Sequence, residues 1–180
     1  MSDINVLVLV GSLRAASVNR QLAELAVETA PDGVRLSVFD GLGELPFYND
    51  DIDNADVPAA VTKLRSAAAE SDAALVVTPE YNGSIPAVIK NAIDWLSRPF
   101  GNGALKDKPL AVVGAALGQY GGVWAHDETR KSFGIAGPRV VDAVKLSLPI
   151  ASLDGKHPRQ SVEVAENIRD VVEKLAAEVG

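Results

Sequence analysis

The chain has 180 residues, 47% of them hydrophobic and 23% charged, and a formal net charge of −7. These values are ordinary for a folded globular protein, and the length predicts a single domain over residues 1–180. The sequence contains no cysteine, which excludes disulfides, thiolate catalysis and zinc–thiolate sites. The sequence has only two histidines, so we expect no histidine-rich metal centre and predict no metal site.

Charge and hydropathy argue against two classes of partner. The lysines and arginines are spread out, whereas nucleic-acid binding needs concentrated positive charge, so we expect no nucleic-acid partner. No run of about 18 apolar residues occurs, so we expect no transmembrane helix and no membrane partner. The first residues lack the pattern of a signal peptide, and the expected location is cytoplasmic.

Hydrophobic periodicity predicts strands and helices in alternation. The expected strands are 4–10, 34–39, 73–78, 109–116 and a short one at 139–144. The expected helices are 18–30, about 56–71, 85–96, 123–133 and 160–179. Strand 34–39 alternates with period two and is expected near a sheet edge, and Ser84 is the expected N-cap of helix 85–96. This order predicts a parallel sheet with helices on both faces.

The first strand is apolar throughout, ends at Gly11 and leads into a short polar loop and a helix. Such a loop presents free backbone N–H groups and the positive end of the helix dipole to an anion. We therefore expect it to hold a phosphate. The side chains that add donors to this loop are Ser12, Arg14, Ser17 and Asn19.

Two familiar phosphate loops do not fit this stretch. A P-loop requires Gly, Lys and Ser or Thr where the chain has Ala16, Ser17 and Val18. The Rossmann fingerprint requires glycines where the chain has Leu13 and Ala16, although Asp40 near the end of the second strand could imitate its ribose-binding acid. A loop rich in hydroxyl and amide donors instead suits a monophosphate, the group that flavin mononucleotide (FMN) carries.

Two more glycine-bearing loops, residues 79–84 and 117–122, follow the third and fourth strands. Because the carboxyl ends of parallel strands share one edge of a sheet, we expect all three loops to build one site. The second loop could present N–H groups to the polar edge of a flat ring, with Gly83 allowing a close approach. The third loop could cover the other flank of that ring.

Two motifs carry a resemblance to a known family. Residues 11–20, GSLRAASVNR, resemble the G-S-x-R-x-x-S-x-N phosphate loop of the NAD(P)H-dependent FMN reductases, which include chromate-, quinone- and azo-reducing enzymes. Residues 79–86, PEYNGSIP, continuing to KNAIDW at 90–95, are similar to that family's second signature. With the pair Gly121 and Gly122, the resemblance spans residues 4 to about 145.

The resemblance implies a flavodoxin-like three-layer αβα sandwich, with a five-stranded parallel sheet in the order 2-1-3-4-5. It also implies bound FMN, with NADPH or NADH as co-substrate. No side-chain acid or base is needed for hydride transfer, so we predict no catalytic residue. The implied FMN-binding residues are Ser12, Arg14, Ser17, Asn19, Pro79, Glu80, Tyr81, Asn82, Gly83 and Gly118.

The implied function is ping-pong hydride transfer from NAD(P)H, through FMN, to quinones, free flavin, azo compounds or metal oxyanions such as chromate. Two alternatives stay open at this point: a flavodoxin-type electron carrier and a non-enzymatic regulatory protein on the same fold. The resemblance further implies a homodimer or homotetramer with helix 85–96 at the interface.

Several residues outside the loops are expected in other roles. Asn91, Asp94 and Trp95 are expected in packing or at an interface, and both His126 and His157 on the surface. For Arg98 and Arg130 two roles stay open: an exposed salt bridge, or a contact with the phosphates of NAD(P)H.

Overall fold

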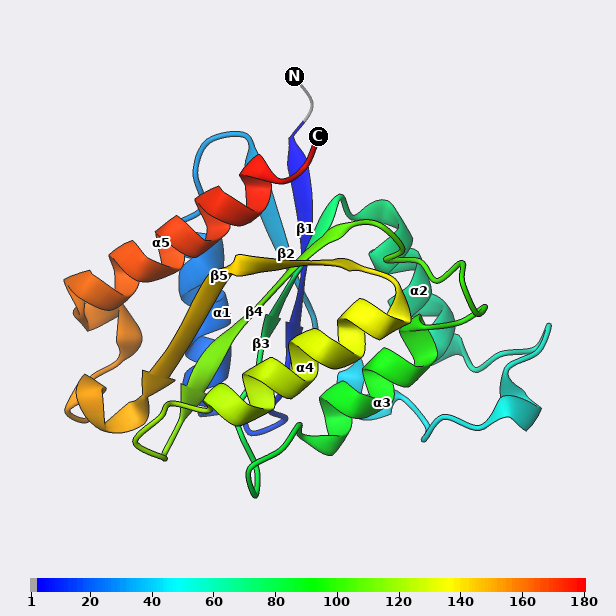
Figure 1. The fold of residues 1–180 in the computed structure, drawn as a ribbon, viewed down its shortest axis with the longest axis horizontal. Coiled ribbons are helices and arrows are strands. Elements are labelled where there is room, and N and C mark those ends of the chain that lie inside the picture. Colours follow the sequence, from blue (N-terminus) through cyan, green and yellow to red (C-terminus); the bar gives the residue numbers. More distant parts are fainter. Residues whose placement is uncertain (1–2) are drawn as a thin grey trace.

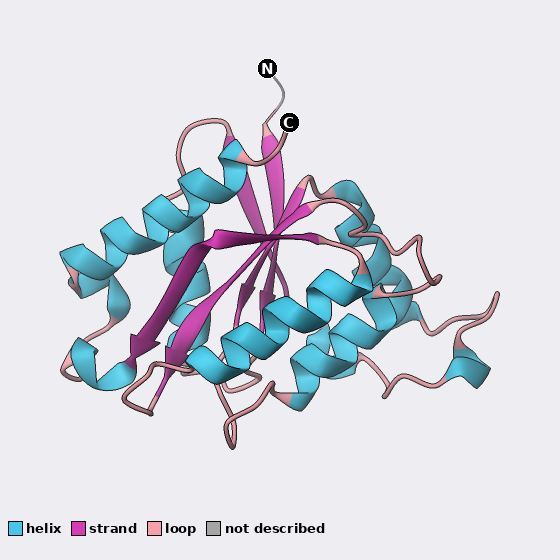
Figure 2. Ribbon diagram, in the orientation of Figure 1, coloured by secondary structure: helices cyan, strands magenta, loops and turns pink. Residues whose placement is uncertain are grey.

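The computed structural model describes residues 3–180 as a parallel sheet between two layers of helices (Figures 1 and 2). The strand order is β2-β1-β3-β4-β5, which confirms the predicted flavodoxin-like arrangement. The strands are β1 (Ile4–Val10), β2 (Val34–Phe39), β3 (Ala73–Val77), β4 (Pro109–Ala116) and β5 (Arg139–Pro149). The central strands β3 and β4 are buried at every residue, whereas β2 lies at an edge and is half exposed, as its alternating sequence predicts.

Helices cover both faces of the sheet, as Figure 1 shows. The helices α1 (Val18–Glu28) and α5 (Val162–Ala177) pack on one face, in a core that also contains Val8 and Leu75. The other face carries α2 (Ala59–Glu70), α3 (Ala87–Leu96) and α4 (Val123–Ala136). Short 3-10 helices lie in the connections: η1 (Leu42–Glu44), η2 (Asp50–Ile52), η3 (Ile150–Leu153) and η4 (Pro158–Gln160). No helix within residues 3–180 combines the length and apolarity needed to cross a membrane.

Strand β5 continues well past the predicted end at residue 144. Its pairing with β4 shifts between Leu110, opposite Val140, and Val112, opposite Lys145, so residues 141–144 form a bulge. Figure 1 shows the resulting bend in the strand. The side chain of Arg130 donates from Nη2 to the Val112 carbonyl at this bulge, at 2.7 Å. Of the two roles left open for Arg130, the structure shows a salt bridge, to Asp127 at 2.8 Å, but the arginine itself is buried and not exposed as expected.

The start of α3 also differs from the prediction. The helix begins at Ala87 after Pro86, which provides no side-chain cap. Ser84 is therefore not the N-cap. Its hydroxyl instead donates to Glu128 of α4 at 2.8 Å, because the chain makes a tight turn before the helix begins.

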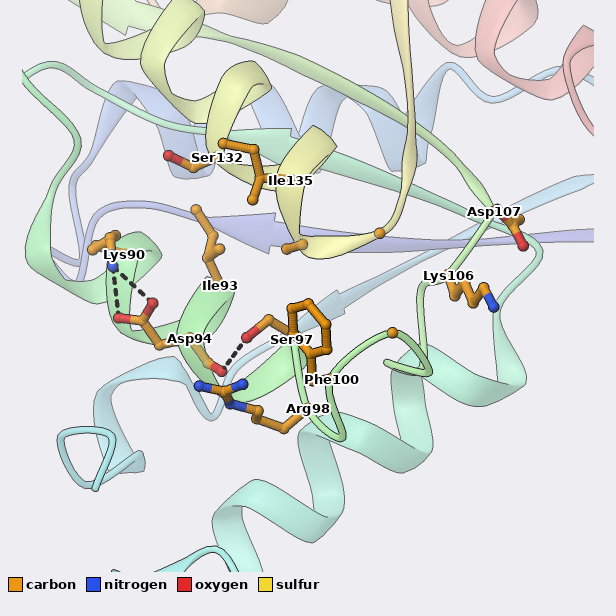
Figure 3. A pocket seen from close by; sticks show the side chains of 13 residues that line it. Lys90, Ile93, Asp94, Ser97, Arg98, Phe100, Lys106, Asp107, Ser132 and Ile135 are labelled. Atoms are coloured by element: carbon orange, nitrogen blue, oxygen red, sulfur yellow. Dashed lines mark hydrogen bonds and ion pairs between the residues drawn. The ribbon is translucent and has the colours of Figure 1, made fainter. Parts of the chain in front are cut away.

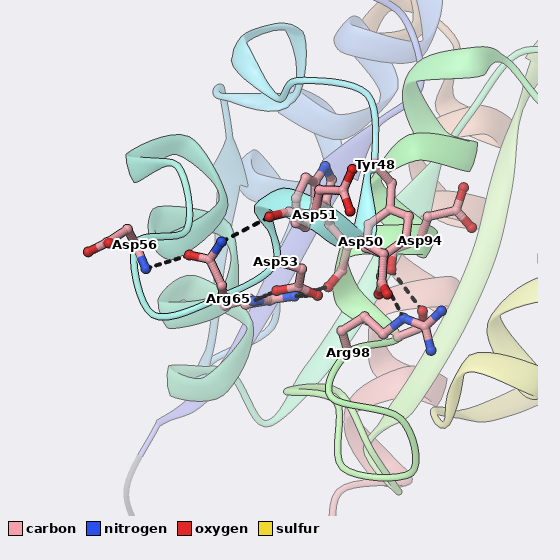
Figure 4. Close-up of polar contacts among 11 residues, drawn as sticks. Tyr48, Asp50, Asp51, Asp53, Asp56, Arg65, Asp94 and Arg98 are labelled. Atoms are coloured by element: carbon pink, nitrogen blue, oxygen red, sulfur yellow. Dashed lines mark hydrogen bonds and ion pairs between the residues drawn. The ribbon is translucent and has the colours of Figure 1, made fainter.

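Side chains of α3 hold the long connection between β2 and α2. Asn91 accepts a hydrogen bond from the Tyr48 N–H at 2.8 Å, and Trp95 donates from Nε1 to the Pro46 carbonyl at 2.8 Å. Arg65 of α2 pairs with both oxygens of Asp53 at 2.9 and 3.0 Å, as Figure 4 shows. Asn91 and Trp95 are confirmed as packing residues, and the KNAIDW segment serves to anchor this connection.

Gly114 in β4 lies where no side chain fits. A Cβ at this position would clash with the Thr78 carbonyl oxygen and would lie 2.8 Å from Oδ1 of Asn19. We expect Gly114→Ala to lower the free energy of unfolding by about 3 kcal/mol or more, because buried backbone has to move apart. Urea titration of the purified variant measures this effect.

Gly134 in α4 is the matched control. Its Cβ would lie 3.7 Å from the Val140 side chain, an ordinary contact. Gly134→Ala should raise stability by about 0.5–1 kcal/mol, because alanine loses less backbone entropy in a helix. Equal effects of the two substitutions would contradict the assignment of Gly114 as a close-approach position.

Candidate functional site

The loops after β1, β3 and β4 meet at the carboxyl edge of the sheet, beyond the arrowheads in Figure 1. They enclose a cleft of ≈ 350 Å³. Of the ten predicted site residues, those lining the cleft are Ser12, Arg14, Ser17, Asn19, Pro79, Glu80, Tyr81 and Gly118. Asn82 and Gly83 lie outside the lining.

Four other lining residues carried no sequence signal: Val18, Ala115, Ala116 and, from the segment after β5, Ile150. A further lining residue, Leu117, lies in the predicted third loop. Small or apolar side chains of this kind are common in any core, so only their position at the strand ends identifies them.

The first loop ends in the N-terminus of α1. Ser17 is the N-cap, and its hydroxyl oxygen accepts a hydrogen bond from the Asn19 N–H at 3.2 Å. Within residues 3–180, the N–H groups of residues 13–16 and of Val18 have no hydrogen-bond partner. These free donors and the positive helix end make the loop suitable for an anion. Arg14 adds an exposed guanidinium to it.

Asn19 is buried, and its carboxamide is turned toward β4. Oδ1 accepts from the Ala115 N–H at 2.8 Å, and Nδ2 donates to the Ala115 carbonyl at 2.9 Å. The backbone of β3 pairs with β4 only as far as Thr78. Beyond that point, the Asn19 side chain provides the hydrogen-bond partners for the backbone of β4. For a ligand, Asn19 retains the second hydrogen of Nδ2.

The second loop is a tight turn between Tyr81 and Ser84, whose N–H and carbonyl groups pair with each other at 3.1 and 3.0 Å. Asn82 and Gly83 both have positive φ, of 52° and 73°. This is the conformation that Asn-Gly sequences favour in type I′ turns. The turn leaves Tyr81 half exposed at the cleft and the N–H groups of Asn82 and Gly83 unpaired within the described chain.

Helix α4 holds this second loop from its other side. The Glu80 carboxylate accepts from the Ala125 N–H at 3.2 Å and so caps the N-terminus of α4, whose N-cap residue, Gly122, has no side chain to do so. The Ser84 to Glu128 hydrogen bond adds a second attachment. The motif residues Glu80 and Ser84 therefore bind α4 in this structure.

The third loop brings one exposed apolar side chain to the cleft, Leu117, which is 87% exposed. Outside the cleft lining, the ring of Tyr120 in this loop lies 5.6 Å from that of Trp124 in α4. Gly121 and Gly122 have positive φ, and a Cβ at Gly121 would collide with the backbone of β5. Gly118 has open space around it.

His126 lies fully buried beneath the loops, which contradicts the expectation of a surface histidine. Its Nε2 is 2.8 Å from the Thr78 carbonyl and its Nδ1 is 2.7 Å from the Ser147 hydroxyl. A carbonyl can only accept, so Nε2 carries the proton and Nδ1 accepts from Ser147. The pKa of His126 is lowered, chiefly by burial, so the ring is neutral.

We expect His126→Phe to lower the free energy of unfolding by about 2 kcal/mol or more, because the Thr78 carbonyl and the Ser147 hydroxyl lose their partner. The wild type should also lose stability as pH falls below about 6.5, the ordinary histidine pKa, because the unfolded chain then binds the proton more strongly. Urea titrations between pH 8 and 5 should show this component in the wild type and not in His126→Phe. His157→Phe, at η4, is the control that should keep it.

Comparison with known proteins agrees with the geometry. A family model described as NADPH-dependent FMN reductase matches residues 4–152. A quinone reductase of Pseudomonas putida is 44% identical over 133 residues, which are 73% of this chain and 71% of that protein. A 2-hydroxy-1,4-benzoquinone reductase of Burkholderia sp. is 40% identical over 127 residues, 71% of this chain and 68% of that protein.

Among solved structures, FerB, a flavoenzyme NAD(P)H:(acceptor) oxidoreductase from Paracoccus denitrificans, superposes with a TM-score of 0.86 at 33% identity. The match covers 98% of this chain and 97% of that one. The relatives and the family model agree on an oxidoreductase; the family model supplies the cofactors FMN and NADPH, and FerB is named as a flavoenzyme that uses NAD(P)H. The chain belongs to the NADPH-dependent FMN reductase family.

Proposed function

We propose that the protein is an FMN-dependent NAD(P)H:quinone oxidoreductase that works by a ping-pong mechanism. The observation that carries this proposal is the cleft in which three loops meet, the first two of them with unpaired N–H groups. Relatives named for quinone reduction support the choice of acceptor. We extend the proposal to free flavin, azo compounds and metal oxyanions such as chromate, and to a cytoplasmic location, where reduced nicotinamide is available.

The first loop fits the phosphate of FMN. A phosphate needs several donors at once, and residues 13–16 together with Val18 offer a run of unpaired N–H groups at a helix N-terminus. We propose that Ser12, Arg14 and Ser17 bind the phosphate directly. Asn19 would then act mainly by fixing α1 to Ala115, with one Nδ2 hydrogen left for the ligand.

The second and third loops fit a flat ring. The turn at 79–83 offers the N–H groups of Asn82 and Gly83, and Pro79 and Tyr81 supply apolar surface. Gly118 leaves room on the opposite flank because nothing lies within 4 Å of its absent Cβ. Bound FMN supplies hydride acceptance and donation in this cleft.

The residues of the chain position the reactants. N–H groups of the second loop favour negative charge on the polar edge of the ring. Tyr81 and Leu117, both exposed, offer apolar contact to a nicotinamide or a quinone on the open face. Because one open face has to serve donor and acceptor, we propose that they bind in turn.

Anaerobic NADH or NADPH should bleach the yellow FMN-loaded protein, and an added quinone should restore the colour. We expect this because, in the proposed cleft, the nicotinamide and the quinone both react at the same flavin ring. Absorbance at the flavin band measures both steps. An electron carrier would stay oxidised on addition of the nicotinamide, and a regulatory protein would take up no FMN; either result overturns the proposal.

The double variant Arg14→Ala with Ser17→Ala should weaken FMN binding by about tenfold or more, because a charge-assisted hydrogen bond and a hydroxyl donor are lost. Fluorescence titration of the apoprotein with FMN measures the affinity. Arg35→Ala with Ser37→Ala on β2 is a matched control and should bind FMN like the wild type. Unchanged affinity in the first variant would contradict the phosphate-loop assignment.

We also propose a homo-oligomer with α3 at the interface. A cavity of ≈ 540 Å³ lies between α3, the end of α4 and the 97–107 connection (Figure 3). Phe100 and Ile135, which line it, are 87% and 78% exposed. Large exposed apolar side chains around one groove are typical of contact sites between proteins, and we take the occupant to be a second copy.

Phe100→Glu combined with Ile135→Glu should shift the protein toward the monomer, because two charges would be buried without partners. Sedimentation velocity measures the change. Val162→Glu is the control: Val162 is an equally exposed apolar residue, 73%, at the start of α5 in the other helix layer. A wild-type protein that sediments as a monomer would overturn this proposal.

A further inference from the structure

A second cavity, of ≈ 390 Å³, borders the first loop on its β2 side. The cleft and this cavity share Ser12 and Arg14 in their linings. A ligand that leaves the cleft across the first loop therefore enters the cavity. The proposed FMN site makes no use of this space.

The walls of the cavity differ in character. Leu13, Phe39 and Leu42 form apolar surface, and Leu13 is 65% exposed. The polar part consists of Ser12 and Arg14, which the proposed function assigns to the FMN phosphate, of a second arginine, Arg20, and of the two acids Glu24 and Asp40. An apolar wall next to hydrogen-bonding groups suits a ligand that joins a flat base to a sugar.

Arg20 and Asp40 share one contact. Nη1 of Arg20 lies 2.5 Å from Oδ1 of Asp40, and its Nε lies 3.1 Å from Glu24. The arginine charge is thus shared between two carboxylates. The Asp40 side chain is 71% exposed, and its Oδ2 has no partner among residues 3–180, so a residue that lines the cavity retains a free acceptor.

We propose that this cavity binds the adenosine half of the reduced nicotinamide, and that Asp40 makes the enzyme prefer NADH to NADPH. This inference rests on the proposed function, because it places the second half of the same donor. The nicotinamide end lies in the cleft, and the adenosine end reaches the cavity across Ser12 and Arg14.

The carboxylate of Asp40 is the reason why we expect NADH to be preferred over NADPH. A carboxylate accepts hydrogen bonds from the hydroxyls of a ribose, and it repels a phosphate on the 2′ position. Neither arginine of the lining compensates: Arg20 is already paired with both acids, and Arg14 is assigned to the FMN phosphate in the proposed function. An acid after the second strand of a parallel sheet has the same effect in dinucleotide-binding folds. Here it acts beside a mononucleotide loop.

Asp40→Asn tests the proposal on the FMN-loaded enzyme. The ratio of kcat/KM for NADPH to that for NADH should rise by about tenfold, because the repulsion is removed and Arg20 can approach the 2′-phosphate. Isothermal titration with NADP⁺ and NAD⁺ should show affinities that shift in the same direction, without any turnover.

Asp3→Asn is the matched control. Asp3 forms a comparable exposed pair with Arg35, at 3.0 Å, at the opposite end of the same strands. Its ratio should equal that of the wild type. If Asp40→Asn keeps the wild-type ratio while NADH still bleaches its flavin, the inference is wrong and the proposed function stands. If the wild-type protein binds no FMN, both the inference and the proposed function are wrong.

Discussion

The carbonyl oxygen of Thr78 fixes the geometry of the whole site. His126 donates to it from α4, and the backbone of β4 passes so close that residue 114 has to be glycine. The Thr78 side chain lies against Gly11, where a Cβ would collide with its hydroxyl. The ends of β1, β3 and β4 are therefore held together at one residue, and the three loops begin from that point.

Helix α4 keeps this arrangement in place, although its sequence pattern is weak. Glu80 caps its first turn, Ser84 bonds to Glu128, and Arg130 reaches the Val112 carbonyl at the β5 bulge. Two of these contacts come from side chains of the second loop, and the third joins an arginine of α4 itself to the backbone of β4. These tertiary contacts stabilise the helix, because its own sequence offers no N-terminal side-chain cap.

The site is suited to an anion even though the chain carries a net charge of −7. Its donors are mainly backbone N–H groups at the start of α1, which bind a phosphate without adding net charge. Arg14 is the cation at the loop, whereas Arg20 nearby is neutralised by Asp40 and Glu24. The proposed phosphate site and the proposed nucleotide-selecting residue therefore lie on the two sides of one short loop.

The sequence by itself determined the strand order through its family resemblance, the edge position of β2 and the place of the three loops. Apolar runs and glycines report local requirements, so they can be interpreted along the chain. Only the tertiary structure decided that Asn19 bonds to Ala115, that β5 continues beyond its bulge, and that His126 is buried. Each depends on a partner distant in the sequence, and no local pattern records which polar group another element will satisfy.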